Sequence, residues 1–185
     1  LGIINSHFSV LPEWRGADPI SFAILSGQQS TGVSVMALVE AMDEGPLLCY
    51  ETLALTGNEN STQLTDKLVK LSYELLKKEI PRFMSGEIKA DKPQTITKRS
   101  VSYSRKLTKQ DGVLDFNKPA RELEREVRAF IEWPKTRTKL ARKDVVVLKA
   151  RVDESQSGEA GTVFLTENKC IGIYTKQGAL IIEEL

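Results

Sequence analysis

The pattern of hydrophobic positions opens with a short apolar run over residues 1–4 that stops at the polar stretch 5–7. A run this short and apolar is typical of a buried strand of a parallel sheet. In such sheets, ligands bind just beyond the carboxyl ends of the strands. We therefore expect Asn5 and His7, the latter being the single histidine of the chain, to lie at a working site.

The following stretch predicts one helix and two strands. An Asp-Pro pair at its start and a glycine at its end predict a helix over residues 18–27. The apolar stretch 33–39 predicts a strand buried on both faces, and 47–55 predicts a second strand. The turn between the two strands, residues 42–46, would present Asp43.

The longest helix is predicted over residues 61–84, where an Asn-Ser-Thr sequence provides the cap. Pro81 is expected to kink or end this helix. The polar residues 85–97 indicate a linker between domains. The main apolar stripe of the helix contains Leu64, Leu68, Leu71, Leu75 and Ile80.

Beyond the linker, the pattern predicts one helix and several short strands. The helix begins near the Lys-Pro pair at 118–119, and its apolar stripe contains Leu123, Val127, Phe130 and Ile131. Short strands at near-regular spacing predict a small β-barrel. These strands are expected over residues 113–116, 145–152, 161–165, 170–174 and 179–185.

The composition is that of a globular protein, with 41% hydrophobic residues and a net charge of +1. The charge is uneven, because residues 91–151 hold 17 Lys and Arg against 8 Asp and Glu. A basic middle segment favours contact with a polyanion, and it equally suits a solvated, loop-rich surface.

The two cysteines and the absence of targeting segments bear on location. Cys49 and Cys170 lie far apart and match no metal spacing, so we expect buried free thiols in a reducing compartment. One histidine and no paired cysteines argue against zinc, and no metal site is expected. No signal peptide or membrane-length apolar stretch is present, which makes the cytoplasm the default location.

Asn5, His7 and Asp43 form the candidate catalytic group. Imidazole exchanges a proton near neutral pH, and a nearby carboxylate orients and stabilises its charged form. An amide donates a hydrogen bond to an oxyanion, so the three suit acyl transfer to an amine. The alternative is that His7 is an ordinary surface or core residue with no catalytic role. The sequence contains no nucleophilic serine elbow, P-loop or dinucleotide fingerprint.

Three linked motifs in the first half carry a resemblance to a known family. Residues 4–16, INSHFSVLPEWRG, resemble the I-N-x-H-x-S-L-L-P-x-[YW]-R-G signature of formyltransferases that use 10-formyltetrahydrofolate. Residues 31–35 and 42–46 resemble the family's T-G-V-T-[IV] strand and D-x-G loop. The resemblance implies that Asn5, His7 and Asp43 are catalytic. It also implies folate contacts at Ser9, Val10, Leu11 and Pro12.

The second half resembles the C-terminal domain of methionyl-tRNA formyltransferases. Residues 101–109, VSYSRKLTK, are similar to its opening segment, and Trp133-Pro134 matches a further landmark. This implies 10-formyltetrahydrofolate as co-substrate and initiator methionyl-tRNA as partner. The expected tRNA contacts are Lys98, Arg99, Arg105 and Lys106. The alternatives are an amino-sugar formyltransferase, a formyltetrahydrofolate-hydrolysing relative, or an inactive tRNA-binding fragment.

The resemblance also implies the fold class and the domains. We expect an α/β chain in which residues 1–84 form the second half of a Rossmann-like formyltransferase domain. Residues 85–97 would be the linker, and residues 98–185 would be an OB-like β-barrel domain. The family's first Rossmann half has no counterpart here, so we expect the chain alone to transfer little formyl. We expect it either to associate through its first strand or to regain activity when the missing half is supplied.

Overall fold

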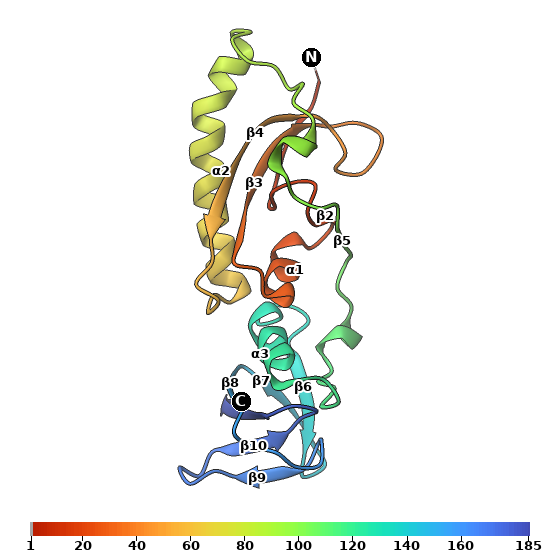
Figure 1. The fold of residues 1–185 in the computed structure, drawn as a ribbon, viewed down its shortest axis with the longest axis vertical. Helices are drawn as coiled ribbons and strands as arrows, with labels where there is room; N and C mark the ends of the chain where they lie inside the picture. The colour runs from red at the N-terminus through yellow and green to blue at the C-terminus, as the bar shows by residue number, and fades with distance from the viewer. Residues whose placement is uncertain (1) are drawn as a thin grey trace. The chain divides into compact units, whose positions relative to one another are not determined.

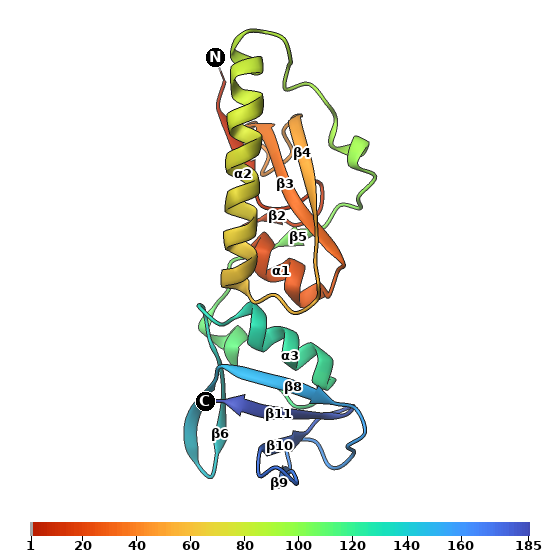
Figure 2. The ribbon, with the colours of Figure 1, turned by 90° about the vertical axis from the view of Figure 1, so that its left-hand side faces the viewer.

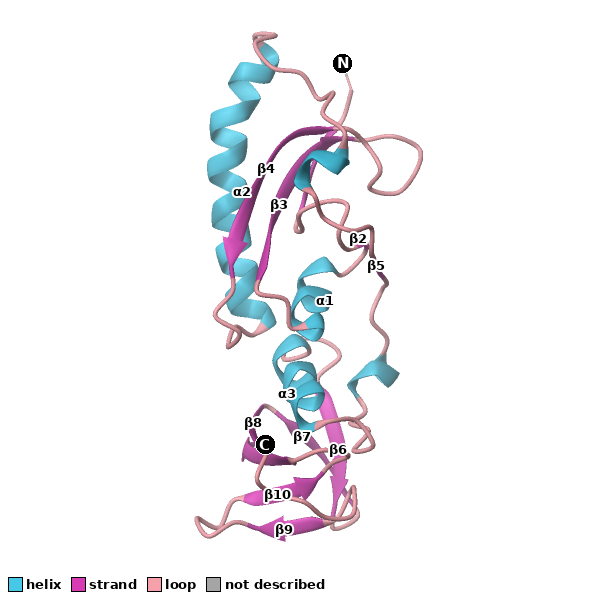
Figure 3. Ribbon diagram, viewed as in Figure 1, coloured by secondary structure: helices cyan, strands magenta, loops and turns pink. Residues whose placement is uncertain are grey.

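The computed structural model describes residues 2–185 and divides the chain into two compact units, Leu1–Lys106 and Leu107–Leu185. Leu1, which belongs to the predicted first strand, lies outside the described residues. Figures 1 and 3 show that the first unit combines helices with a small sheet, whereas strands dominate the second.

The first unit contains a three-stranded sheet in the order β1-β3-β4. Its strands are β1 (Ile4–His7), β3 (Ser30–Ala37) and β4 (Leu47–Ala54), and neighbours are antiparallel. The two longer strands confirm the strands predicted at 33–39 and 47–55. In β3 the middle six residues are buried, as a strand covered on both faces requires.

The expectation of a parallel sheet at β1 is wrong among the described strands. β1 runs antiparallel to β3, with His7 opposite Ser34, and Ile3 before it is 67% exposed. Asn5 and His7 therefore lie within the strand and not beyond its end. The apolar content of the run predicted burial, but it holds no information on the direction of the neighbouring strand.

Two α-helices accompany this sheet. α1 (Pro19–Ser26) ends at Gly27, whose φ of 69° gives the left-handed cap, and the predicted helix is confirmed. α2 (Ser61–Met84) packs on β3 and β4, and Figure 2 shows it running along the sheet. Asn60 caps α2 through its side chain, as predicted. The helix continues through Pro81, however, and its buried face includes Ser72 and Glu79.

The segment after α2 returns to the sheet of the first unit at Lys92. Lys92 and Leu47 exchange two backbone hydrogen bonds, and the 3₁₀ helix η1 (Gln94–Thr97) follows. The short strand β5 (Tyr103–Ser104) then pairs in parallel with β2 (Arg15–Gly16). Residues 85–106 are thus an integral part of the first unit.

The second unit packs α3 (Ala120–Ala129) against a four-stranded antiparallel sheet and a separate hairpin. The sheet order is β8-β11-β10-β9, and the hairpin pairs β6 with β7. The core is apolar and includes Leu123, Val127 and Leu180. The strands are β6 (Thr136–Leu140), β7 (Lys143–Val147), β8 (Lys149–Asp153), β9 (Val163–Leu165), β10 (Ile171–Tyr174) and β11 (Ala179–Glu184).

Two expectations for this unit are corrected, and one strand was not predicted. Residues 113–116 form no strand; Val113 makes a single bridge to Arg137, next to the 3₁₀ helix η2 (Lys109–Gly112). The predicted strand 145–152 splits into two strands. β6 was not predicted because its Thr and basic residues alternate without an apolar run.

Cys49 and Cys170 are free thiols, as expected, but both are half-buried and not fully buried. No helix among residues 2–185 is long and apolar enough to span a membrane.

Candidate functional site

β1 places His7 in the interior of the first unit. The ring is 6% exposed, and its Nε2 lies 3.0 Å from the carbonyl oxygen of Trp14. Burial lowers the pKa of His7 below its ordinary value of 6.5, while the carboxylate of Asp43 and the carbonyl of Trp14 act in the opposite direction. The balance keeps the imidazole neutral near neutral pH.

The turn between β3 and β4 brings Asp43 to the other side of the ring. The carboxylate Oδ2 lies 3.7 Å from His7 Nδ1, and the side chain is 13% exposed. The same oxygen accepts a hydrogen bond of 2.8 Å from the backbone N–H of Gly16. Asp43 has a φ of 53°, so it sits in the left-handed region that non-glycine residues seldom adopt.

These contacts assign the two ring nitrogens of His7. A carbonyl oxygen only accepts, so the contact with Trp14 places the proton of the neutral ring on Nε2. Nδ1 then holds the lone pair, and it faces Asp43. A proton arriving at Nδ1 would be stabilised by this carboxylate, which is the arrangement of a general base with a charged partner.

Asn5 shares a strand face with His7, because side chains two residues apart along a strand point the same way. It is half-buried and makes no side-chain hydrogen bond with another residue among 2–185. The amide is thus available to an incoming group. Of the three predicted catalytic residues, the structure brings His7 and Asp43 into contact and places Asn5 beside His7 on β1.

The loop predicted to contact folate, residues 9–12, is buried in the unit. Its backbone carbonyls all have partners within the chain, and the bonds are between 2.8 and 3.2 Å. The donors to the carbonyls of Ser9, Val10, Leu11 and Pro12 are Ser34 Oγ, Glu13 N, Thr97 Oγ1 and Ser102 N, respectively. The loop therefore has a fixed shape, but its side chains have little surface to offer a ligand.

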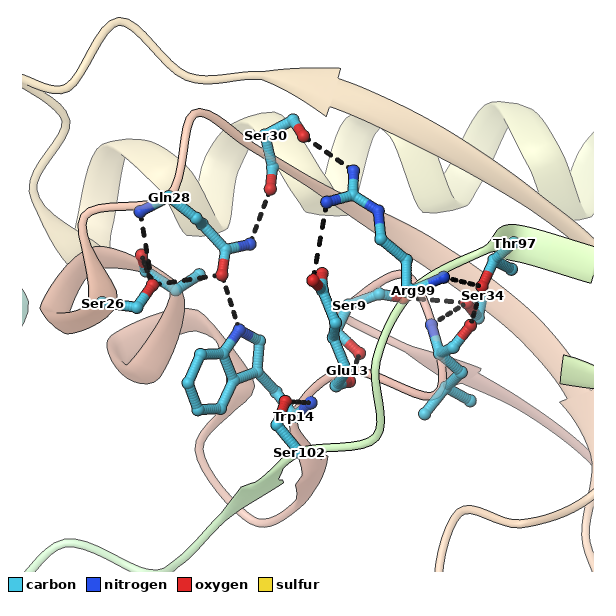
Figure 4. Close-up of polar contacts among 12 residues, drawn as sticks. Ser9, Glu13, Trp14, Ser26, Gln28, Ser30, Ser34, Thr97, Arg99 and Ser102 are labelled. Carbon is cyan, nitrogen blue, oxygen red and sulfur yellow. Dashed lines mark hydrogen bonds and ion pairs between the residues drawn. The ribbon is translucent and has the colours of Figure 1, made fainter. Parts of the chain in front are cut away.

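The four predicted tRNA contacts differ in their surroundings. Arg99 donates to Ser30 Oγ at 2.7 Å and pairs with Glu13 at 3.5 Å, so it fastens the chain internally (Figure 4). Lys98, Arg105 and Lys106 are exposed. Arg105 also donates to the carbonyl of Lys106.

The sequence did not predict three groups that lie next to His7 or Asp43. They are the carbonyl of Trp14, which contacts His7, the hydroxyl of Ser34, which lies opposite His7 in the sheet, and the amide of Gln94, which donates to the carbonyl of Asp43. The first is backbone and leaves no sequence signal. Ser34 lies inside a resembling motif, which could have drawn attention to it. Gln94 lies in a polar stretch that predicted a linker. No group of three or more His, Cys, Asp or Glu among residues 2–185 could hold a metal ion.

Comparison with known proteins bears on both halves of the chain. Residues 1–80 match the family described as "Formyl transferase", and residues 106–185 match "Formyl transferase, C-terminal domain". The chain belongs to the formyltransferase family. Asn5, His7 and Asp43 of the candidate site lie within the first matched segment.

Among curated relatives, two methionyl-tRNA formyltransferases illustrate the similarity. That of Myxococcus xanthus is 38% identical over 184 residues, which is 100% of this chain and 58% of the relative. That of Listeria monocytogenes is 35% identical over 182 residues, 98% of this chain and 57% of the relative. The chain thus spans less than two thirds of these relatives.

Two solved structures share the fold. An N-formyltransferase from Helicobacter canadensis, in complex with folinic acid and dTDP-3-aminofucose, is 19% identical, with a TM-score of 0.76 over 99% of this chain and 66% of its own. HypX from Aquifex aeolicus, in complex with tetrahydrofolic acid, is 21% identical, with a TM-score of 0.72 over 97% of this chain and 31% of its own. At such identities the likeness concerns the fold alone.

Proposed function

We propose that the protein transfers the formyl group of 10-formyltetrahydrofolate to the α-amine of initiator methionyl-tRNA. The observation that carries the proposal is the buried His7, held between a carbonyl oxygen at Nε2 and the Asp43 carboxylate at Nδ1, in a chain of the formyltransferase family. This is a proton acceptor beside a charge that stabilises its protonated form.

The choice of acceptor rests on sequence similarity. Methionyl-tRNA formyltransferases align with 98–100% of the chain at 35–38% identity. The structure solved with an amino sugar is 19% identical and supports the shared fold only. A methionyl-tRNA acceptor is therefore favoured over an amino sugar.

In the proposed reaction, each of the three site residues has one task. 10-Formyltetrahydrofolate supplies the activated formyl group. Asn5 donates a hydrogen bond from its amide to the formyl oxygen as negative charge develops there. His7 accepts the proton of the attacking amine at Nδ1, and Asp43 stabilises the resulting imidazolium. The imidazolium then gives this proton to N10 of the folate as the bond between N10 and the formyl carbon breaks, which releases the formylated amine and tetrahydrofolate. The buried loop 9–12 would contact the folate in a shape that its backbone hydrogen bonds fix.

The finer structural expectations belong with this proposal. Residues 1–84 would be the second half of a Rossmann-like domain, and the second unit would be an OB-like barrel. The six strands of that unit and their single core support the latter. A cytoplasmic location would accompany a role in translation initiation.

The test measures formyl transfer by the protein, with methionyl-tRNA and dTDP-3-aminofucose as rival acceptors. We expect formyl-methionyl-tRNA, and a loss of at least about 10²-fold in His7→Ala, the lower range for removal of a general base. Transfer to the sugar alone would overturn the acceptor. Near-normal turnover in His7→Ala would overturn the role of His7.

A further inference from the structure

Gln94, on η1, is buried to an unusual degree for a residue in a polar stretch, with 7% of its surface exposed. Its amide is fully used. Nε2 donates to the carbonyl oxygens of Asp43 at 2.7 Å and Gly45 at 3.0 Å. Oε1 accepts from Arg15, at 2.7 Å from Nη2 and 3.3 Å from Nε.

These bonds clamp the turn that presents Asp43. The two carbonyls held by Gln94 flank Glu44, whose carboxylate binds Arg15 Nη1 at 2.7 Å. Arg15 precedes Gly16, which donates its backbone N–H to the Asp43 carboxylate. Gln94 therefore ties together the two segments between which Asp43 is fixed.

The turn needs such support, because Asp43 has a left-handed backbone with a φ of 53°. For a non-glycine residue this conformation costs free energy and persists only where the surroundings impose it. The two amide donors of Gln94 act on the carbonyl of Asp43 itself and on that of Gly45.

We propose that Gln94 is a positioning residue, which holds the Asp43 carboxylate at its place beside His7. A glutamine suits the task because it offers two donors to the turn and one acceptor to Arg15 from a single planar group. A glutamate lacks the donors and a methionine lacks both. The role rests on the proposed function, since positioning matters only where the contact between Asp43 and His7 serves catalysis.

The test uses the 185-residue chain, whose single histidine gives unambiguous imidazole resonances in an NMR titration. Asp43→Asn gives the reference shift, which is the change in the pKa of His7 when the carboxylate charge is lost. Removal of an opposite charge at this distance should lower the pKa of His7 by about one unit or more. Gln94→Met keeps the volume and removes the hydrogen bonds. We expect it to lower the pKa of His7 by at least about half of that shift, and to add nothing in the Asp43→Asn background.

Thr97→Val is the matched control. Thr97 lies on the same 3₁₀ helix, and its hydroxyl is within hydrogen-bond distance of the backbone carbonyls of Leu11 and Gln94 but not of the Asp43 turn. It should leave the titration of His7 unchanged. A pKa of His7 in Gln94→Met equal to that in Thr97→Val would overturn the proposal, as would an undiminished shift in the Asp43→Asn background.

If the Gln94→Met chain fails to fold, a second measurement on the wild-type chain tests the proposal. Both side-chain amide protons of Gln94 should exchange slowly with solvent, because both are donated to buried carbonyls. Fast exchange would overturn the proposal. Neither measurement requires folate or an amine, so a failure of the proposed function would appear separately, as absent formyl transfer.

Discussion

The hydroxyl oxygen of Ser34 accepts a hydrogen bond of 2.9 Å from the backbone N–H of Leu11. The same hydroxyl donates to the carbonyl of Ser9 at 2.8 Å, so one buried side chain of β3 closes the loop 9–12 (Figure 4). Ser34 also lies opposite His7 in the pairing of β3 with β1. A single residue of the sheet thus joins the candidate base to the loop expected to contact folate.

Ser34→Ala should disturb this loop more than it disturbs the chemistry. It leaves one buried N–H and one buried carbonyl without their partner, at a cost of about 1–3 kcal/mol each. In the active enzyme we expect a raised KM for 10-formyltetrahydrofolate and a smaller effect on kcat. Steady-state kinetics with varied folate measure both. Ser34→Thr retains the hydroxyl and serves as the control, and a change in kcat alone would contradict this role.

The state of His7 predicts the acid limb of the pH profile. His7 must be neutral to accept a proton, and its pKa lies below 6.5. The midpoint of the acid limb of kcat/KM should therefore lie below pH 6.5. Asp43→Asn removes a charge that raises the pKa of His7, so it should move the limb to still lower pH, with kcat reduced about 10²-fold. An acid limb above pH 6.5 would refute the assignment of His7 as the base.

The stability of the first unit should depend on Glu59, which is buried just before α2. Burial raises the pKa of its carboxyl, but hydrogen bonds from Lys67 and from the backbone of Thr56 outweigh this and lower it from 4.5 to about 2. Because the folded-state pKa is depressed, the stabilisation is present above pH 4.5 and is lost as the pH falls toward 2.

Glu59→Gln should consequently lower the free energy of unfolding at pH 7 by about 1–3 kcal/mol, since it removes charge-assisted bonds. It should also flatten the dependence of stability on pH between 4.5 and 2. Urea unfolding at several pH values measures both effects. The exposed Glu51→Gln is the control, and an equal slope in the two variants would contradict the prediction.

Local signals in the sequence predicted several elements well. The cap at Asn60 and the stripe after it predicted α2, and the apolar stretches around the Asp43 turn predicted β3 and β4. In each case the signal and the structure it specifies lie within the same few residues. Patterns of this kind report burial and turns directly.

What the sequence did not predict depends on partners far along the chain. Gln94 reads as part of a polar linker, and only its contacts with residues 43–45 reveal a buried amide. The antiparallel pairing of β1 depends on β3, and the proton position on His7 depends on a carbonyl that the loop presents. Contacts of this range follow from the fold and have no local sequence pattern.

The basic residues between positions 98 and 106 should fall into two classes in tRNA binding. Lys106 is exposed, whereas Arg99 is committed to Ser30 and Glu13. If Lys106 contacts a phosphate, Lys106→Gln should weaken binding and reduce the slope of log K against log salt by about 1. Arg99→Gln should leave that slope unchanged and lower the stability of the first unit. Binding titrations at several salt concentrations, with urea unfolding of both variants, separate the two. A reduced slope in Arg99→Gln with unaltered stability would contradict this division, because it would mean that Arg99 binds an RNA phosphate and not Ser30 and Glu13.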